Sequence, residues 1–240
     1  MTVSHRLSSP RLTKAGIGRM ITVILSLVAT AAIFFLTAGT IDIDRGWLYY
    51  GGQFAYLMFA MVVIARFFPQ VVETINARGR LNKDVKTWDK LFGLAYAILL
   101  LLQPAIAGWD VGRIHSFEAP LFVSALALAL TILSNMFVHW AMISNKHAET
   151  GVRIQNDRHH AVVSSGPYRI VRHPFYISLI VTSLVYPLAV GSLYAFAPGL
   201  AIAMLVVWRT AREDETLRRE LDGYEVFTKQ TRYRLLPGVW

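Results

Sequence analysis

Four long apolar runs constrain this chain more than any other feature. Each run is about as long as the ~20 residues that a helix needs to cross a bilayer, and the runs cover residues 17–38, 47–65, 91–109 and 117–143. Two shorter apolar runs follow at 175–190 and 193–208, separated by Gly191. A soluble chain of 240 residues would not bury so many such segments in succession. We therefore predict an all-α, polytopic membrane protein with about six transmembrane helices, the last two forming a C-terminal helical hairpin.

Composition agrees with a membrane setting. Hydrophobic residues make up 55% of the chain and charged residues only 16%, whereas about a quarter of the residues in an ordinary soluble domain are charged. The first apolar run follows a basic segment, as in a secretory signal peptide. At about twenty residues it exceeds the usual 7–15 residues of a cleavable apolar core, so we expect it to remain as an anchor.

The positive charges are distributed unevenly along the chain. All 24 lysines and arginines except Arg45 and Arg113 fall in tails and loops on one side of a six-span arrangement. By the positive-inside rule that side is the cytoplasm, so both termini should be cytoplasmic, at the inner membrane if the source is a prokaryote. We expect no nucleic-acid partner, because the sequence lacks a basic helix with interleaved aromatic residues and lacks zinc-finger spacing.

Several kinds of chemistry have no support in the sequence. The chain has no cysteine, which excludes disulfides, thiol nucleophiles and cysteine-ligated metals. The seven histidines are scattered, and the pair His159 and His160 has no carboxylate at ligand spacing, so we predict no metal site. Gly16 and Gly18 lack the preceding strand and the third glycine of a dinucleotide-binding loop.

The candidate catalytic and binding residues begin near Asn145. We therefore divide the chain into a first part, 1–116, with three spans, and a second part, 117–240, with the fourth span, a polar loop, the hairpin and the tail. The loop, 145–172, has no long apolar periodicity, and we expect short helical or extended pieces there.

A helix should start directly after this loop. Gly166 and Pro167 predict a turn, and Pro174 suits the first turn of a helix that begins at His173. The unpaired amides at that helix start favour an anion, and Arg169 and Arg172 add positive charge. For these two arginines alone, anchoring at the lipid headgroups is the simpler interpretation.

The segment that leaves the hairpin supplies a second polar group. Arg209 and Glu213 lie four residues apart on one helical face, and Glu220 continues that face. The plain alternative is a solvated helix with internal ion pairs, which we accept for Arg218, Arg219 and Asp222. Arg209 directly follows an apolar run, where a charge is costly unless it faces a protein interior or a water-filled cavity.

Several strings in the second part carry a family resemblance. They are Gln155-Asn156-Asp157, then His160, then SGPYRIVRHPFY at 165–176, then RTAREDETL at 209–217, and finally GYEVFTKQTRYRLLPGVW at 223–240. In this order and spacing they resemble the isoprenylcysteine carboxyl methyltransferase-like membrane methyltransferases, over about residues 130–240. The resemblance implies a helical membrane enzyme that binds S-adenosylmethionine without a Rossmann domain.

The same resemblance implies site residues. It assigns cofactor contacts to Gln155, His160, Ala161, Val162, Val163, Tyr168, His173, Pro174, Phe175, Tyr176 and Glu213, and it places the catalytic, acceptor-facing role on Arg209. The acceptor stays open: a prenylated cysteine carboxylate, a lipid amine, another lipid or a small thiol.

One further pair comes from the apolar part of the chain. Asn135 and His139, four residues apart in the fourth span, either face the acceptor or hold helices together, since polar residues in spans serve both purposes. The sequence does not indicate an oligomeric state.

Two other functions remain open at this point. The membrane sterol reductases share a similar C-terminal hairpin and use NADPH, but the sequence between Tyr168 and Arg209 offers no dedicated set of contacts for a 2′-phosphate. A transporter or assembly protein would leave the residues from Gln155 to Tyr176 without a purpose.

Overall fold

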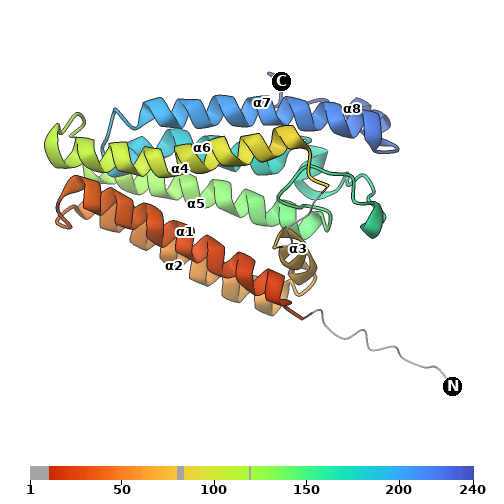
Figure 1. The fold of residues 1–240 in the computed structure, drawn as a ribbon, viewed down its shortest axis with the longest axis horizontal. Helices are drawn as coiled ribbons and strands as arrows, with labels where there is room; N and C mark the ends of the chain where they lie inside the picture. Colours follow the sequence, from red (N-terminus) through yellow and green to blue (C-terminus); the bar gives the residue numbers. More distant parts are fainter. Residues whose placement is uncertain (1–10, 80–83, 119) are drawn as a thin grey trace.

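The computed structural model describes residues 11–79, 84–118 and 120–240, and the described part of the chain is all-α (Figure 1). The α-helices are α1 (Lys14–Ala38), α2 (Asp44–Phe67), α3 (Val71–Arg78), α4 (Thr87–Arg113), α5 (Leu121–Ser144), α6 (Pro174–Val190), α7 (Phe196–Glu220) and α8 (Tyr224–Gln230). Two 3₁₀ turns, η1 (Asn156–Arg158) and η2 (Gly166–Arg169), interrupt the loop before α6. The prediction of a loop with short helical pieces is confirmed.

The long apolar runs form the long helices. In the described residues four helices, α1, α2, α4 and α5, are long and apolar enough to cross a membrane, and α6 is a shorter apolar helix. α7 is apolar as far as Trp208 and charged from Arg209 onward. The chain is thus a multi-pass helical membrane protein with four candidate spans plus the α6–α7 hairpin.

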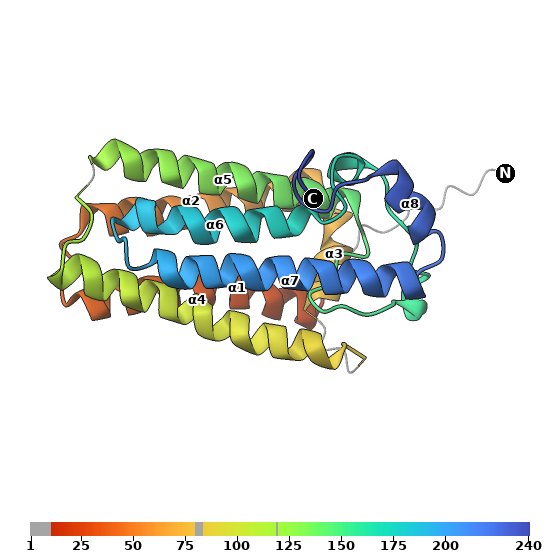
Figure 2. The same ribbon diagram turned by 90° about the horizontal axis from the view of Figure 1, so that it is seen from above.

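Close helix packing holds the bundle together. α1 packs along α4, and α6 packs between α5 and α7 (Figure 2). Gly108 and Gly112, spaced four residues apart on α4, lie against the backbone of α1: a Cβ added at either position would sit 2.1 Å from the carbonyl oxygen of Phe34 or Ala38. Small residues at this spacing allow two membrane helices to approach closely.

The two ends of the bundle differ. One end, the hairpin end, has only the short connections α1–α2, α4–α5 and α6–α7. Gly191 ends α6 with a φ of +83°, a conformation that favours glycine, and the predicted tight hairpin is confirmed. The other end, the loop-rich end, gathers α3, the 145–173 segment, α8 and the tail after α8 (Figures 1 and 2).

Candidate functional site

The loop-rich end is joined to the hairpin by main-chain contacts. His173 directly precedes α6 and Pro174 is the first helical residue, as predicted. The amides of Arg172 and His173 donate to the carbonyls of Tyr233 and Arg234 at 2.9 and 3.0 Å. The loop, the start of α6 and the tail therefore meet at one place.

A buried carboxylate, Asp214 of α7, organises this meeting point. Its side chain is 0% exposed, and it accepts hydrogen bonds from Arg172 Nε at 2.7 Å, His173 Nε2 at 3.2 Å, Tyr224 Oη at 3.0 Å, Arg218 Nε at 3.2 Å and Arg234 Nε at 3.0 Å. We call Asp214 and these five partners the Asp214 cluster. One carboxylate thus connects the loop, α6, α7, α8 and the tail.

The protonation of Asp214 follows from this environment. Burial alone would raise the pKa of its carboxyl, but the hydrogen bonds from His173 and Arg172 outweigh burial and hold the pKa well below its usual range. Interpreting Arg172 as a headgroup anchor is therefore wrong. Its side chain is 2% exposed and compensates a buried charge, whereas Arg169 is exposed.

Glu213, the neighbour of Asp214, faces a different group. The Tyr176 hydroxyl donates a hydrogen bond to its carboxylate, and the Tyr176 ring stacks on the His173 ring with centroids 5.8 Å apart. The Glu213 side chain is partly exposed. Three of the predicted cofactor residues are thus brought together at the start of α6.

Arg209 lies one turn earlier on α7 and is 8% exposed. Its Nε and Nη2 donate to the two carboxylate oxygens of Asp89 at 2.8 and 3.2 Å, and Nη2 also donates to the Thr150 carbonyl at 2.8 Å. The guanidinium lies 4.4 Å from the ring centroid of Phe92 and 5.2 Å from that of Tyr176. The plain alternative, an ion pair with Glu213 on an exposed helix, does not occur in the described residues.

Gln155 and His160 lie together in the middle of the loop. The buried Gln155 side chain donates to the His147 carbonyl at 2.5 Å and accepts from Arg158. The His147 and His160 rings lie 5.0 Å apart. Burial, aided by the nearby His147 and Arg153, lowers the pKa of His160 to about 4, so this ring is neutral at neutral pH.

The remaining predicted cofactor residues divide between an apolar cluster and the surface. Val162, Val163, Tyr168 and Phe175 pack with residues of α7 and α8, whereas Ala161 is exposed. The Tyr168 hydroxyl accepts from the Asn145 amide at 3.0 Å.

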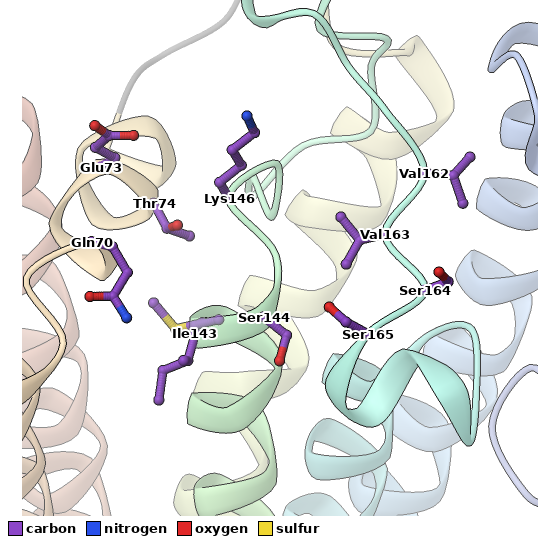
Figure 3. Close-up of a pocket in the computed structure, with 11 residues that line it drawn as sticks. Gln70, Glu73, Thr74, Ile143, Ser144, Lys146, Val162, Val163, Ser164 and Ser165 are labelled. Carbon is purple, nitrogen blue, oxygen red and sulfur yellow. The ribbon is translucent and has the colours of Figure 1, made fainter.

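An open pocket of about 480 Å³ lies beside this stretch. As Figure 3 shows, one of its walls carries Val162, Val163, Ser164 and Ser165, while Glu73 and Thr74 of α3 and the preceding Gln70 lie on the opposite side.

The pair within the fourth span makes contacts between helices. Asn135 donates to Gln53 of α2 at 3.2 Å and accepts from Ser178 of α6 at 3.0 Å. His139 Nδ1 and the Tyr56 hydroxyl of α2 are hydrogen-bonded at 2.8 Å. Both side chains thus join α5 to its neighbours, and their role toward an acceptor stays a prediction.

Sequence reasoning missed several residues of the site, among them Asp214, Asp89 and Tyr224. Asp214 is adjacent to Glu213, but nothing in the sequence indicated which of the two was buried. Asp89 carried a signal: it is an acid at the edge of an apolar run, where a charge needs a partner. Tyr224 lies in the tail string and carries no local signal, because its contact with Asp214 is tertiary.

Fold and site together define a polytopic helical membrane protein in which one end of the bundle assembles a loop, a helical hairpin and a tail around buried charges. Comparison with known families identifies this arrangement further. Residues 126–219 match the model of the isoprenylcysteine carboxyl methyltransferase (ICMT) family, and over these residues the chain is a domain of that family. The family comprises methyltransferases that use S-adenosylmethionine, so residues 126–219 form a membrane methyltransferase domain with that cofactor. A comparison with curated proteins gives no match.

Proposed function

We propose that the loop-rich end transfers a methyl group from S-adenosylmethionine to a lipophilic or small acceptor at the cytoplasmic boundary of the membrane. The observation that carries this proposal is the division of partners on α7. Glu213 accepts a hydrogen bond from Tyr176 of α6, whereas Arg209, one turn nearer the apolar part of the helix, donates hydrogen bonds to Asp89 of α4.

The residues present fit the cofactor. Glu213 is a partly exposed carboxylate whose one hydrogen bond in the described residues comes from Tyr176, so it has acceptor capacity left for an ammonium or a hydroxyl. Neighbouring aromatic rings and apolar side chains suit a nucleoside. The residues that would hold the cofactor are Gln155, His160, Ala161, Val162, Val163, Tyr168, His173, Pro174, Phe175, Tyr176 and Glu213.

Catalysis then depends on how the chain positions the acceptor relative to the cofactor. Bound S-adenosylmethionine supplies a methyl group on a positively charged sulfur, which is already an activated electrophile. The chain has to orient the acceptor and keep water away, and such positioning is a large part of catalysis. Arg209 suits the orienting role, because a guanidinium presents several donors in a fixed plane to a carboxylate or other polar acceptor group.

The reaction takes place at the membrane boundary, where the two reactants meet. A lipophilic acceptor approaches from the bilayer along the apolar helices, while the water-soluble cofactor approaches from the loop-rich end. We propose six spans with both termini cytoplasmic, supported by the unequal distribution of lysine and arginine.

Accessibility labelling tests this topology directly, because the chain has no cysteine. A single cysteine introduced next to Arg113 should react with an impermeant thiol reagent from outside intact cells. A cysteine introduced after Trp240 should react only in opened cells. The reverse pattern would contradict the topology.

Two substitutions on α7 test the division of roles. Glu213→Gln should weaken S-adenosylmethionine binding, measured by calorimetry on the purified protein in detergent. Arg209→Met should keep cofactor affinity nearly intact and lower single-turnover methyl transfer by about 100-fold, equal to about 2.7 kcal/mol of transition-state stabilisation.

The exposed Asp222 and Lys229 offer matched controls, as Asp222→Asn and Lys229→Met. Equal loss of cofactor binding in the Glu213 and Arg209 variants would indicate a structural role for both residues. Saturable binding of NADPH in place of S-adenosylmethionine would contradict the proposed reaction.

A further inference from the structure

Asp89 lies in the first turn of α4, outside residues 126–219 that match the family model. It is nevertheless 5% exposed and in direct contact with the proposed site. Its two carboxylate oxygens accept from Arg209 Nε and Nη2, and one of them, Oδ2, also accepts from the Val152 amide at 2.7 Å. One side chain from the first half of the chain therefore holds both α7 and the loop.

The arrangement restricts Arg209 strongly. Two donors of its guanidinium are fixed by Asp89, and Nη2 is also bound to the Thr150 carbonyl. The rings of Phe92 and Tyr176 lie against the guanidinium at 4.4 and 5.2 Å. In the described residues Nη1 makes no hydrogen bond. A bidentate pair of this kind fixes the plane of the guanidinium as well as its position.

We propose that Asp89 is a positioning residue for methyl transfer: it sets the plane of Arg209 for the acceptor and ties the start of the 145–173 segment to the same point. This inference rests on the proposed function. It gives the first half of the chain a part in the site, because the group that orients Arg209 comes from α4.

A purely structural ion pair is the competing explanation. Buried ion pairs are frequently replaceable with little loss of stability, although removal of one partner is costly. α4 itself offers a matched control at its other end. Asp110 is 0% exposed and accepts hydrogen bonds from the hydroxyls of Ser116 and Ser192. Asp110→Asn therefore reproduces the loss of a buried carboxylate on the same helix, far from Arg209.

The test compares Asp89→Asn and Asp110→Asn in the full-length protein in detergent. Transfer of tritiated methyl groups from S-adenosylmethionine into a total membrane extract should fall by about 10- to 50-fold in Asp89→Asn, since a mispositioned group costs rate rather than cofactor affinity. The calorimetric Kd for S-adenosylmethionine should stay within about threefold of wild type. Asp110→Asn should leave both quantities near wild type.

A double-mutant cycle separates positioning from structural support. In an Arg209→Met background, Asp89→Asn should cause no further loss of transfer if Asp89 acts through Arg209. An equal loss in both backgrounds would overturn the proposal, as would unchanged transfer in Asp89→Asn alone. If Asp89→Asn does not fold, Asp89→Glu takes its place: its carboxylate is displaced by one methylene, and unchanged transfer there would also overturn the proposal.

Hydrogen exchange tests the link to the loop without any methyl transfer. Peptides that contain Val152 should exchange faster in Asp89→Asn than in wild type or Asp110→Asn, because the amide loses its charged acceptor. Unchanged exchange would overturn the proposed link. If the wild type binds no S-adenosylmethionine and transfers no methyl group, the proposed function fails, while the exchange result still decides whether Asp89 holds the loop.

Discussion

Both ends of the bundle contain buried aspartates, but the groups that donate hydrogen bonds to these aspartates differ between the two ends. At the hairpin end Asp110 is bound by neutral donors: the hydroxyls of Ser116 and Ser192, each at 2.5 Å, and the amides of Ser116 and Tyr194. At the loop-rich end Asp214 and Asp89 are bound chiefly by guanidinium groups.

This difference indicates what each end is built for. Neutral donors from nearby turns are sufficient to fix short connections, and Asp110 does this for the turns that follow α4 and α6. Both kinds of donor join segments far apart in the sequence, since Ser192 lies 82 residues from Asp110, Arg172 lies 42 residues from Asp214 and Arg209 lies 120 residues from Asp89. The two ends therefore differ in the charge of the donors. Buried charges are costly unless paired, and a cluster of them is typical of a functional site.

The largest expected effect is the loss of the Asp214 cluster. Asp214→Ala leaves the buried Arg172 without its compensating charge and should destabilise the protein by about 3–5 kcal/mol. It should also abolish S-adenosylmethionine binding, because the start of α6 and the tail lose their common partner. Thermal unfolding and calorimetry in detergent measure the two effects.

Asp110→Ala is the counterpart at the hairpin end. It removes hydrogen bonds to neutral groups and should cost about 1–3 kcal/mol, with cofactor affinity retained in the folded fraction. If Asp110→Ala abolished cofactor binding as completely as Asp214→Ala, the proposed difference between the two ends would be wrong.

The pH dependence of stability should come from the loop-rich end. His160 has a folded pKa of about 4, below the ordinary value of about 6.5, so the unfolded chain takes up the proton first as the pH falls. Its contribution to stability should therefore decrease from about pH 6.5 down to about pH 4. Asp214 has a lowered pKa, so its contribution is lost only at more acid pH, below about 3.9.

A titration of the unfolding temperature between pH 7 and pH 4 checks the first of these effects. His160→Gln should flatten the curve in this range, whereas His159→Gln, a change of the exposed neighbour, should leave the slope as it is. An identical slope in His160→Gln and wild type would remove His160 as its source.

A change confined to the hairpin end should alter stability alone. Gly191→Ala forces an alanine into a left-handed conformation and brings its Cβ to 2.3 Å from an Arg45 nitrogen. The conformational cost is about 1–2 kcal/mol. The unfolding temperature should fall, and the Kd for S-adenosylmethionine should not change. Gly51, where an added Cβ meets nothing within 4 Å, provides the control as Gly51→Ala.

The sequence predicted the helices better than the site. Apolar runs of bilayer length fix where helices form, and α6 begins at the expected proline because proline, which has no amide proton, is favoured in the first turn of a helix. The Asp214 cluster was out of reach, since its members come from five segments and nothing local distinguishes Asp214 from the solvated Asp222. The headgroup interpretation of Arg172 is wrong for the same reason: its partner lies 42 residues away.

For Arg209 the local sequence predicts one part of the environment and not the other. Its position after an apolar run indicated correctly that it needs a polar environment in the interior. The identity of its partner did not follow, because helical spacing pointed to Glu213, whereas the bundle places Asp89 of α4 beside it. Local sequence thus predicted that the charge would be compensated, and tertiary packing decided by which residue.

The smallest expected effect lies between the two ends, at His139. The histidine joins α5 to α2 through the Tyr56 hydroxyl at 2.8 Å, and hydrogen bonds between membrane helices contribute about 0.6 kcal/mol on average. If His139 serves only to join the two helices, His139→Phe should lower the unfolding temperature slightly and leave methyl transfer unchanged, and Tyr56→Phe should match it because both changes remove the same hydrogen bond. Transfer measured at limiting membrane extract separates the two roles left open for this residue. If His139→Phe reduced transfer several-fold while Tyr56→Phe did not, the imidazole would face the acceptor, and the functional part of the molecule would extend from the loop-rich end into the middle of the bundle.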